Sequence, residues 1–346
     1  MERVGPGGAA DAAWLVRFRR LVTATIVAAF VLILIGGVVR VSDSGLGCGP
    51  AGSGTQGWPL CEGGLVPAAS AESAIEFSHR VAAGVVGVMI AALAWIALRR
   101  LREHRWLVRG SLAAAGLVLV QAALGGLTVE KGLDEELVAA HLGLAMLLLG
   151  ILILLRRGTK PAAAHDEPSG SRPRALLPLT AVATALVLAT IIAGGYVAGT
   201  EKEGTPGEPA VGQAHVACGE QFPSCNGEFL PFGTSRLVDI QLAHRAFMYL
   251  ASIAVLAMAA VALFGRGQGA RPSPAFALAA VLLAGQVLLG AVNVWAGKHA
   301  GLIVGHLMLA TLLWSTIVYA AATLLPVAAP APQRVGRPGP AETVAA

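Results

Sequence analysis

Long apolar runs separated by short polar segments dominate the chain. Each run approaches the length of about 20 residues that a helix needs to cross the hydrocarbon core of a bilayer. Charged residues cluster between the runs and do not form a polar face along them, as they would in the helices of a soluble protein. The pattern predicts eight membrane-spanning helices, near residues 21–39, 76–98, 110–129, 137–155, 175–198, 238–264, 275–296 and 301–325.

The composition agrees with this pattern. Hydrophobic residues make up 55% of the 346 residues and charged residues 13%, whereas soluble domains carry about 25% charged residues. The sequence therefore predicts an all-α polytopic membrane protein that contacts membrane lipid.

Lysine and arginine residues mark one side of the predicted membrane. With eight spans, both termini and the three even-numbered connections lie on one side, where most of the 25 lysine and arginine residues fall. Because these residues favour the cytoplasmic side, we expect both termini to be cytoplasmic. The net charge of +5 then reflects topology, so no nucleic-acid partner is expected.

All four cysteines fall in the two long outer loops, two in each loop. Disulfides persist outside the cytoplasm, so the simplest prediction is one bridge between Cys48 and Cys61 and another between Cys218 and Cys225. A cysteine-rich metal site is the alternative, although neither pair has the close spacing that such sites usually show.

The sequence repeats itself at a separation of about 165 residues. Equivalent loop segments read "WPLCEGGLVP" and "FPSCNGEFLP", and the first and fifth predicted helices end in "IGGVVR" and "AGGYVA". The pairs separated by 165 residues are His79 and His244, His141 and His306, Arg80 and Arg245, Gln121 and Gln286, and Gly125 and Gly290. An even number of helices in each half predicts two four-helix bundles inserted in the same orientation, a parallel duplication.

The duplication divides the chain into two halves and two connecting or terminal segments. We expect an N-terminal half at 1–160, a cytoplasmic linker at 161–174, a C-terminal half at 175–330 and a cytoplasmic tail at 331–346. The tail is expected to be disordered.

Four histidines lie near the outer starts of the predicted second, fourth, sixth and eighth helices, namely His79, His141, His244 and His306. All four imidazoles are therefore expected at one level, near the outer face, as two pairs. A histidine pair on facing bundle helices is typical of a haem with two axial imidazole ligands. An interhelical hydrogen bond is the alternative for a single histidine, and zinc would need more protein ligands.

Arginine follows the first histidine of each half directly, at Arg80 and Arg245. At that depth a guanidinium could pair with haem propionates, or it could extend to the lipid headgroups. The remaining histidines lie in predicted loops and are expected to be solvated; they are His104, His165, His215 and His299.

The two halves differ in one carboxylate. Glu76 lies one helical turn before His79, on the same face, whereas the equivalent residue of the other half is Gln241. One pocket then carries a group that can stabilise positive charge or move a proton, which makes Glu76 a candidate catalytic residue. The alternative is an acid that stabilises a helix N-terminus.

These motifs together resemble the haem A synthase family. The resemblance rests on "EFSHR", "SGLGC", "WPLC" and the four helix histidines, and it covers residues 20–325. It implies a membrane enzyme that oxidises the C8 methyl group of haem O to a formyl group, giving haem A for a terminal oxidase. It further implies that His79 and His141 face the substrate haem O, that His244 and His306 ligate a haem b cofactor, and that Glu76 is functionally important.

Haem A synthesis in a bacterial-type cell membrane is therefore the predicted function. Haem O synthase and cytochrome oxidase assembly factors are the expected protein partners. A dihaem b electron carrier, or a haem transporter or chaperone, is the alternative. One departure from the family pattern is the wide spacing between Cys48 and Cys61, where "GPAGSGTQG" is inserted.

Overall fold

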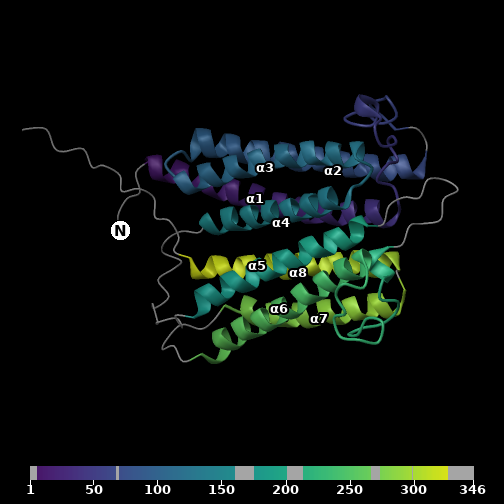
Figure 1. Cartoon of the computed structure of the whole chain (residues 1–346). Helices are drawn as coiled ribbons and strands as arrows, with labels where there is room; N and C mark the ends of the chain where they lie inside the picture. Colours follow the sequence, from purple (N-terminus) through teal and green to yellow (C-terminus); the bar gives the residue numbers. More distant parts are fainter. Residues whose placement is uncertain are drawn as a thin grey trace, which may run out of the picture.

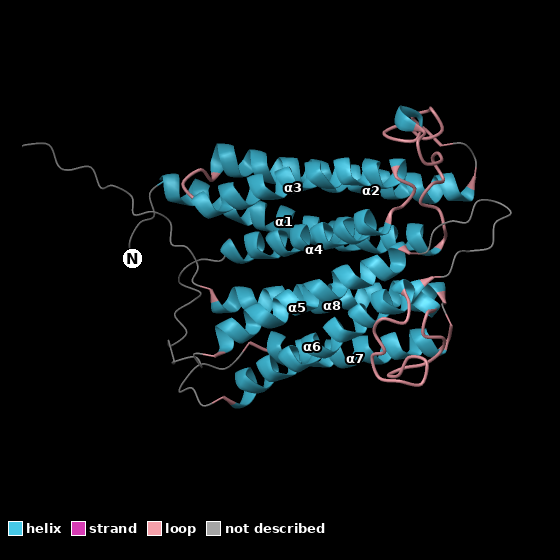
Figure 2. Cartoon of the chain, in the orientation of Figure 1, coloured by secondary structure: helices cyan, strands magenta, loops and turns pink. Residues whose placement is uncertain are grey.

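The computed structural model describes residues 6–67, 70–159, 175–200, 213–265, 273–297 and 299–325. Figures 1 and 2 show that the described chain is built from long helices joined by loops, without strands. The helices are α1 (Pro6–Val41), α2 (Ala71–Arg100), α3 (Arg105–Glu130), α4 (Glu135–Gly158), α5 (Leu176–Gly199), α6 (Arg236–Phe264), α7 (Ala275–Trp295) and α8 (Ala300–Leu324). Two short 3-10 helices, η1 (Gly54–Gln56) and η3 (Ala214–Val216), lie in the loops before α2 and α6. The predicted linker and tail lie outside the described residues.

All eight helices are long and apolar enough to cross a membrane. Their outward surfaces carry many large apolar side chains, such as Val88, Leu119 and Val281, which are 71%, 70% and 67% exposed. Apolar surface of this extent is typical of contact with lipid rather than water. The prediction of an all-α, multi-pass membrane protein with eight spans is confirmed.

Helix α1 begins well before the predicted span. Phe18 in its early part is fully buried. Trp14 stacks with the guanidinium groups of Arg17 and Arg100, which lie 4.7 and 5.0 Å from its ring centroid. These cation–π contacts stabilise a polar helical extension. Hydropathy alone could not reveal this extension, because its residues are not continuously apolar.

Helices α2 and α6 both begin at a serine cap. The Ser70 side chain accepts a hydrogen bond from the N–H of Ser73 at 3.1 Å, and Ser235 accepts one from Val238 at 3.3 Å. Such caps satisfy N–H groups that have no partner within the helix. In both helices the candidate histidine is the ninth residue after the cap, roughly 13 Å along the helix axis.

The helices form two groups that pack against each other. Helices α1 to α4 pack as neighbours, as do α5 to α8, and the groups meet where α4 contacts α5 and α8 and where α1 contacts α8. Figure 1 shows α1 to α4 on one side and α5 to α8 on the other. The two long loops, before α2 and before α6, lie at the same end of the bundle (Figure 1), which we call the loop end.

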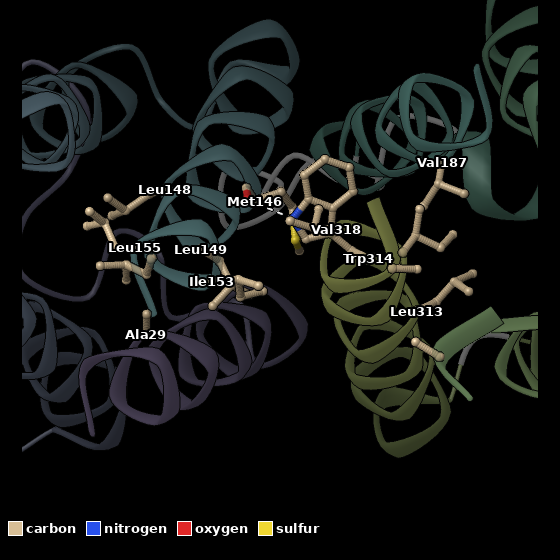
Figure 3. Packing of buried hydrophobic residues seen from close by; sticks show 14 of the residues in the cluster. Ala29, Met146, Leu148, Leu149, Ile153, Leu155, Val187, Leu313, Trp314 and Val318 are labelled. Carbon is tan, nitrogen blue, oxygen red and sulfur yellow. Dashed lines mark hydrogen bonds between the residues drawn. The ribbon is translucent and has the colours of Figure 1, made fainter. Parts of the chain in front are cut away.

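Specific side chains fix the contact between the two groups. Figure 3 shows Trp314 of α8 directed at α4, where its Nε1–H donates to the backbone oxygen of Met146 at 2.7 Å. Near the loop end, Arg236 of α6 pairs with Glu135 of α4. Because these contacts span the middle and one end of the interface, they hold the halves in a fixed relation.

Candidate functional site

His79 on α2 and His244 on α6 each pack against a glycine of the preceding helix. A Cβ atom added at Gly36 of α1 would lie 3.1 Å from Cε1 of His79, and one added at Gly194 of α5 would lie 3.0 Å from Cε1 of His244. Such distances are shorter than ordinary carbon contacts, so any other residue would displace the imidazole. Both glycines belong to the Gly-Gly pairs in the repeated helix ends.

The second histidine of each half has the same kind of neighbour. A Cβ atom added at Gly125 of α3 would lie 3.5 Å from Cε1 of His141, and one added at Gly290 of α7 would lie 2.9 Å from Cε1 of His306. Each of the four imidazoles thus lies against a glycine, and the arrangement recurs in both halves. The sequence repeat links Gly125 with Gly290 but does not reveal that these glycines face the histidines.

The four histidines come together as two pairs, one in each half. His79 and His141 are close enough for their charges to interact, and so are His244 and His306. All four side chains are half-buried, between helices whose other residues are mostly apolar. Paired imidazoles in apolar surroundings suit a haem iron, for which they would supply the two axial ligands.

His79 and His244 differ in the hydrogen bonding of their Nδ1 atoms. Nδ1 of His244 donates to the backbone oxygen of Thr190 at 3.0 Å. This bond places the proton on Nδ1 and leaves the Nε2 lone pair available to a metal. Nδ1 of His79 is buried and has no hydrogen-bond partner among the described residues. The ring of His244 is therefore held in a ligating orientation, whereas no such bond holds the ring of His79.

A glutamine on the odd-numbered helix approaches the second histidine of each pair. Nε2 of Gln286 donates to Nε2 of His306 at 3.1 Å, whereas Nε2 of Gln121 donates to the backbone oxygen of His141 at 3.0 Å. In both glutamines Oε1 is buried without a hydrogen-bond partner among the described residues. A haem iron bound to Nε2 of His306 would require the Gln286 side chain to move aside.

Glu76 lies between the loop before α2 and the N-terminal histidine pair. It is only 4% exposed. Its Oε2 accepts a hydrogen bond from the N–H of Cys48 at 2.8 Å, and its Oε1 accepts one from Arg80. Arg80 also donates to the backbone oxygen of Leu60 at 2.8 Å. The carboxylate and the guanidinium thus attach the loop to the helix that carries His79.

Arg245 binds the loop before α6 in the other half. It donates to the backbone oxygens of Ser224 at 2.8 Å and Gln221 at 2.9 Å, and its guanidinium lies 5.6 Å from the ring centroid of Phe222. Gln241, the equivalent of the acid in the other half, is buried. Both arginines are thus engaged by loop carbonyls, and their contact with haem propionates stays a prediction.

The predicted disulfides are confirmed. Cys48 is bonded to Cys61 and Cys218 to Cys225, with Cα–Cα distances of 4.3 and 4.7 Å. No cysteine is free, so the alternative of a cysteine metal site is excluded. Each bridge closes a compact loop at the loop end of its half.

The remaining histidines only partly match expectation. His299 is exposed, as predicted. His104 is not simply solvated, because its Nε2 lies 3.0 Å from Oδ2 of Asp11, and His215 is half-buried. His165 lies outside the described residues.

Three known proteins that are similar in sequence to this chain share one name. A protein named "Heme A synthase" from Symbiobacterium thermophilum is 30% identical over 312 residues, which cover 85% of this chain and 91% of that protein. One from Shouchella clausii is 28% identical over 248 residues, covering 69% and 74% of the two chains. For one from Halalkalibacterium halodurans the identity is 30% over 210 residues, and the match spans 64% of that protein, just under two thirds.

A family match covers most of the chain. The family described as cytochrome oxidase assembly protein, COX15-CtaA, matches residues 19–318. This range includes six of the candidate spans in full, most of the first and last, and all four histidines of the two pairs. The resemblance suggested by the motifs is confirmed, and the chain belongs to the COX15-CtaA family of cytochrome oxidase assembly proteins.

Proposed function

We propose that this protein is a haem A synthase, which oxidises the C8 methyl group of haem O to a formyl group and so produces haem A for a terminal oxidase. The proposal is supported by the relatives named "Heme A synthase". Haem O synthase and oxidase assembly factors are the protein partners that this function would require.

The observation that carries the proposal is the chemical difference between two otherwise repeated pockets. Both halves present paired histidines against glycines, but only the N-terminal pocket has a buried carboxylate, Glu76, at the position of Gln241. A protein that only carried electrons between two equivalent haems would have no need of this difference. An enzyme that holds one haem and modifies another would need it.

The substrate haem O is assigned to His79 and His141, and the resident haem b to His244 and His306. The bond from His244 to Thr190 favours this assignment, because a fixed, metal-ready imidazole suits a permanent cofactor. His79 has no such bond among the described residues, as suits a site whose occupant must enter and leave. When bound, haem b supplies a one-electron redox centre beside the substrate.

Glu76 is the candidate catalytic residue. Oxidation of a methyl group to a formyl group needs an electron acceptor and an oxygen atom from water or an activated oxygen species, and positive charge develops at the edge of the porphyrin as electrons leave. A buried carboxylate one turn from His79 can stabilise that charge or accept a proton. Arg80 and the N–H of Cys48 orient the carboxylate through its two oxygens, so the loop that carries the disulfide helps to position it.

The proposal includes the membrane orientation and the two-half organisation that the sequence predicts. The loop end faces the outside of a bacterial-type cell membrane, both termini are cytoplasmic, and the histidine pairs lie nearer the outer face. The halves at 1–160 and 175–330 arose by duplication. The recurrence of the glycine–histidine contacts and of the arginine bonds to the loops supports this view.

The pigments bound to the purified wild-type protein test the proposal. We expect haem b together with haem O, haem A or a partly oxidised form between them. Haem b alone would favour an electron carrier, and haem O that is bound but never oxidised would favour a transporter or chaperone.

A further inference from the structure

The Gly-Gly pairs near the ends of α1 and α5 face two different neighbours. Adjacent residues of a helix point about 100° apart, so two adjacent glycines leave space on two sides of the helix. The first glycine of each pair, Gly36 or Gly194, packs against a histidine of its own half. The second glycine, Gly37 or Gly195, faces the other half of the molecule.

Gly37 of α1 lies against α8 of the other half. A Cβ atom added at Gly37 would lie 2.6 Å from Cδ2 of Leu307, which is a severe overlap. Helix α1 can lie this close to α8 only because the position has no side chain. Leu307 directly follows His306, the second histidine of the C-terminal pair. A continuous series of contacts thus runs from His79 through the two glycines to the residue beside His306.

The glycine pair of α5 makes the reciprocal contact. A Cβ atom added at Gly195 would lie 3.2 Å from Cδ2 of Leu142 and 3.2 Å from the Cα atom of Ala139, both on α4. Leu142 directly follows His141, the second histidine of the N-terminal pair. A second series of contacts therefore links His244 to the residue beside His141.

Both contacts belong to the interface between the halves. Helices α1 and α8 contact each other, as do α4 and α5, and both leucines pack against the main cluster of buried apolar residues. Gly199 lies one turn after Gly195, and a Cβ atom added there would lie 2.5 Å from the Cα atom of Glu135 on α4. Small residues spaced by four let membrane helices approach closely, so α4 and α5 cross at a short separation near the histidines.

We propose that Gly37 and Gly195 are positioning residues that set the separation between the haems of the two histidine pairs. The inference rests on the assignment of one haem to each pair in the proposed function. His79 and His244 pack against the first glycine of a pair, and the second glycine contacts the other half. The spacing of the halves and the positions of the haems are therefore fixed together, and a larger residue at either glycine would move the haems apart.

The separation matters because the two haems exchange electrons. An electron that leaves the N-terminal haem reduces the ferric iron of the C-terminal haem to ferrous iron, so one group is oxidised and the other reduced in the same step. The electronic coupling between two redox groups falls steeply as the distance between them grows. In apolar surroundings the charges of the two groups also act on each other more strongly than they would in water. A fixed, short separation therefore favours the exchange.

Circular dichroism in the Soret region tests this role in the full chain loaded with haem b at both sites. Two haems at a short separation give a paired positive and negative band, whose amplitude falls as the haems move apart. We expect Gly37→Ala and Gly195→Ala to bind two haems with low-spin bis-imidazole absorption spectra but to lose amplitude in the paired band. Gly37→Ala combined with Leu307→Ala should regain the amplitude, because the shorter side chain removes the overlap.

A matched control comes from α3. No described atom lies within 4 Å of a Cβ atom added at Gly116, so Gly116→Ala should keep the wild-type band. A wild-type band in both Gly37→Ala and Gly195→Ala would overturn the inference, as would its absence from a wild-type protein that binds two haems. Loss of haem from both variants, without rescue by Leu307→Ala, would also overturn it, since the glycines would then serve haem binding alone. A wild-type protein that binds fewer than two haems would instead refute the haem assignment itself, and the inference with it.

Discussion

Adding one methyl group should disturb the bound haem b at Gly290 but not at the equivalent Gly125. Gly290→Ala would place a Cβ atom 2.9 Å from Cε1 of His306, whereas Gly125→Ala would place one 3.5 Å from Cε1 of His141. The first distance is a severe overlap and the second is an ordinary contact. A free imidazole could swing away from the overlap, but an imidazole bonded to iron is fixed at both ends.

The expected free-energy changes follow from these distances. Overpacking typically costs about 1–3 kcal/mol, and replacing a helical glycine by alanine gains about 1 kcal/mol. Gly290→Ala should therefore destabilise the loaded protein by roughly 0–2 kcal/mol, with the strain concentrated on the ligand. Gly125→Ala should be neutral or stabilising by about 1 kcal/mol.

The absorption spectrum of the purified variants measures the outcome. Gly290→Ala should lose haem b or show a perturbed low-spin spectrum, while Gly125→Ala should keep the wild-type haem b content and spectrum. If the two variants carry the same amount of haem b with identical spectra, the contact between Gly290 and His306 does not matter for ligation, and the reasoning is wrong.

Three further predictions concern single contacts. Trp314→Phe should lower the stability of the detergent-solubilised protein by about 1 kcal/mol, because the hydrogen bond to Met146 is lost; an unchanged melting temperature would argue against this bond as a link between the halves. His244→Ala should abolish the low-spin haem b spectrum while the protein still inserts, and a retained spectrum would contradict the ligand assignment. Cys61→Ser should make the loop before α2 more sensitive to protease and lower haem A output, since the bridge that holds the partner of Glu76 is lost; equal protease sensitivity would count against that role.

Much of the fold was predictable because membrane helices have a simple signature. Apolar length identified all eight spans, and the cysteine positions predicted both bridges. Hydropathy does not predict the early part of α1 because Arg17, Arg19 and Arg20 interrupt the apolar run, although Arg17 stabilises the helix by stacking on Trp14.

The site was predictable where residues repeat and unpredictable where they meet across the fold. A constant separation linked His141 with His306 and Gly125 with Gly290. The bond between Glu76 and the N–H of Cys48 joins a helix to the backbone of a loop, and no spacing rule predicts it. Likewise, nothing in the sequence around Ala214 reveals that its N–H donates to Oγ1 of Thr200 at the end of α5.

The central claim is that Glu76 serves the oxidation of a haem in the N-terminal pocket, and replacing this acid tests it most directly. Glu76→Gln removes the negative charge with little change in size, and Glu72→Gln removes the same charge from an exposed position one turn earlier on α2. Both proteins are expressed with haem O available, and the extracted haems are separated and quantified. We expect the Glu72→Gln protein to yield haem A like the wild type, and the Glu76→Gln protein to retain haem b but accumulate haem O or a partly oxidised haem, with little haem A. Haem A at the wild-type level in the Glu76→Gln protein would contradict the claim.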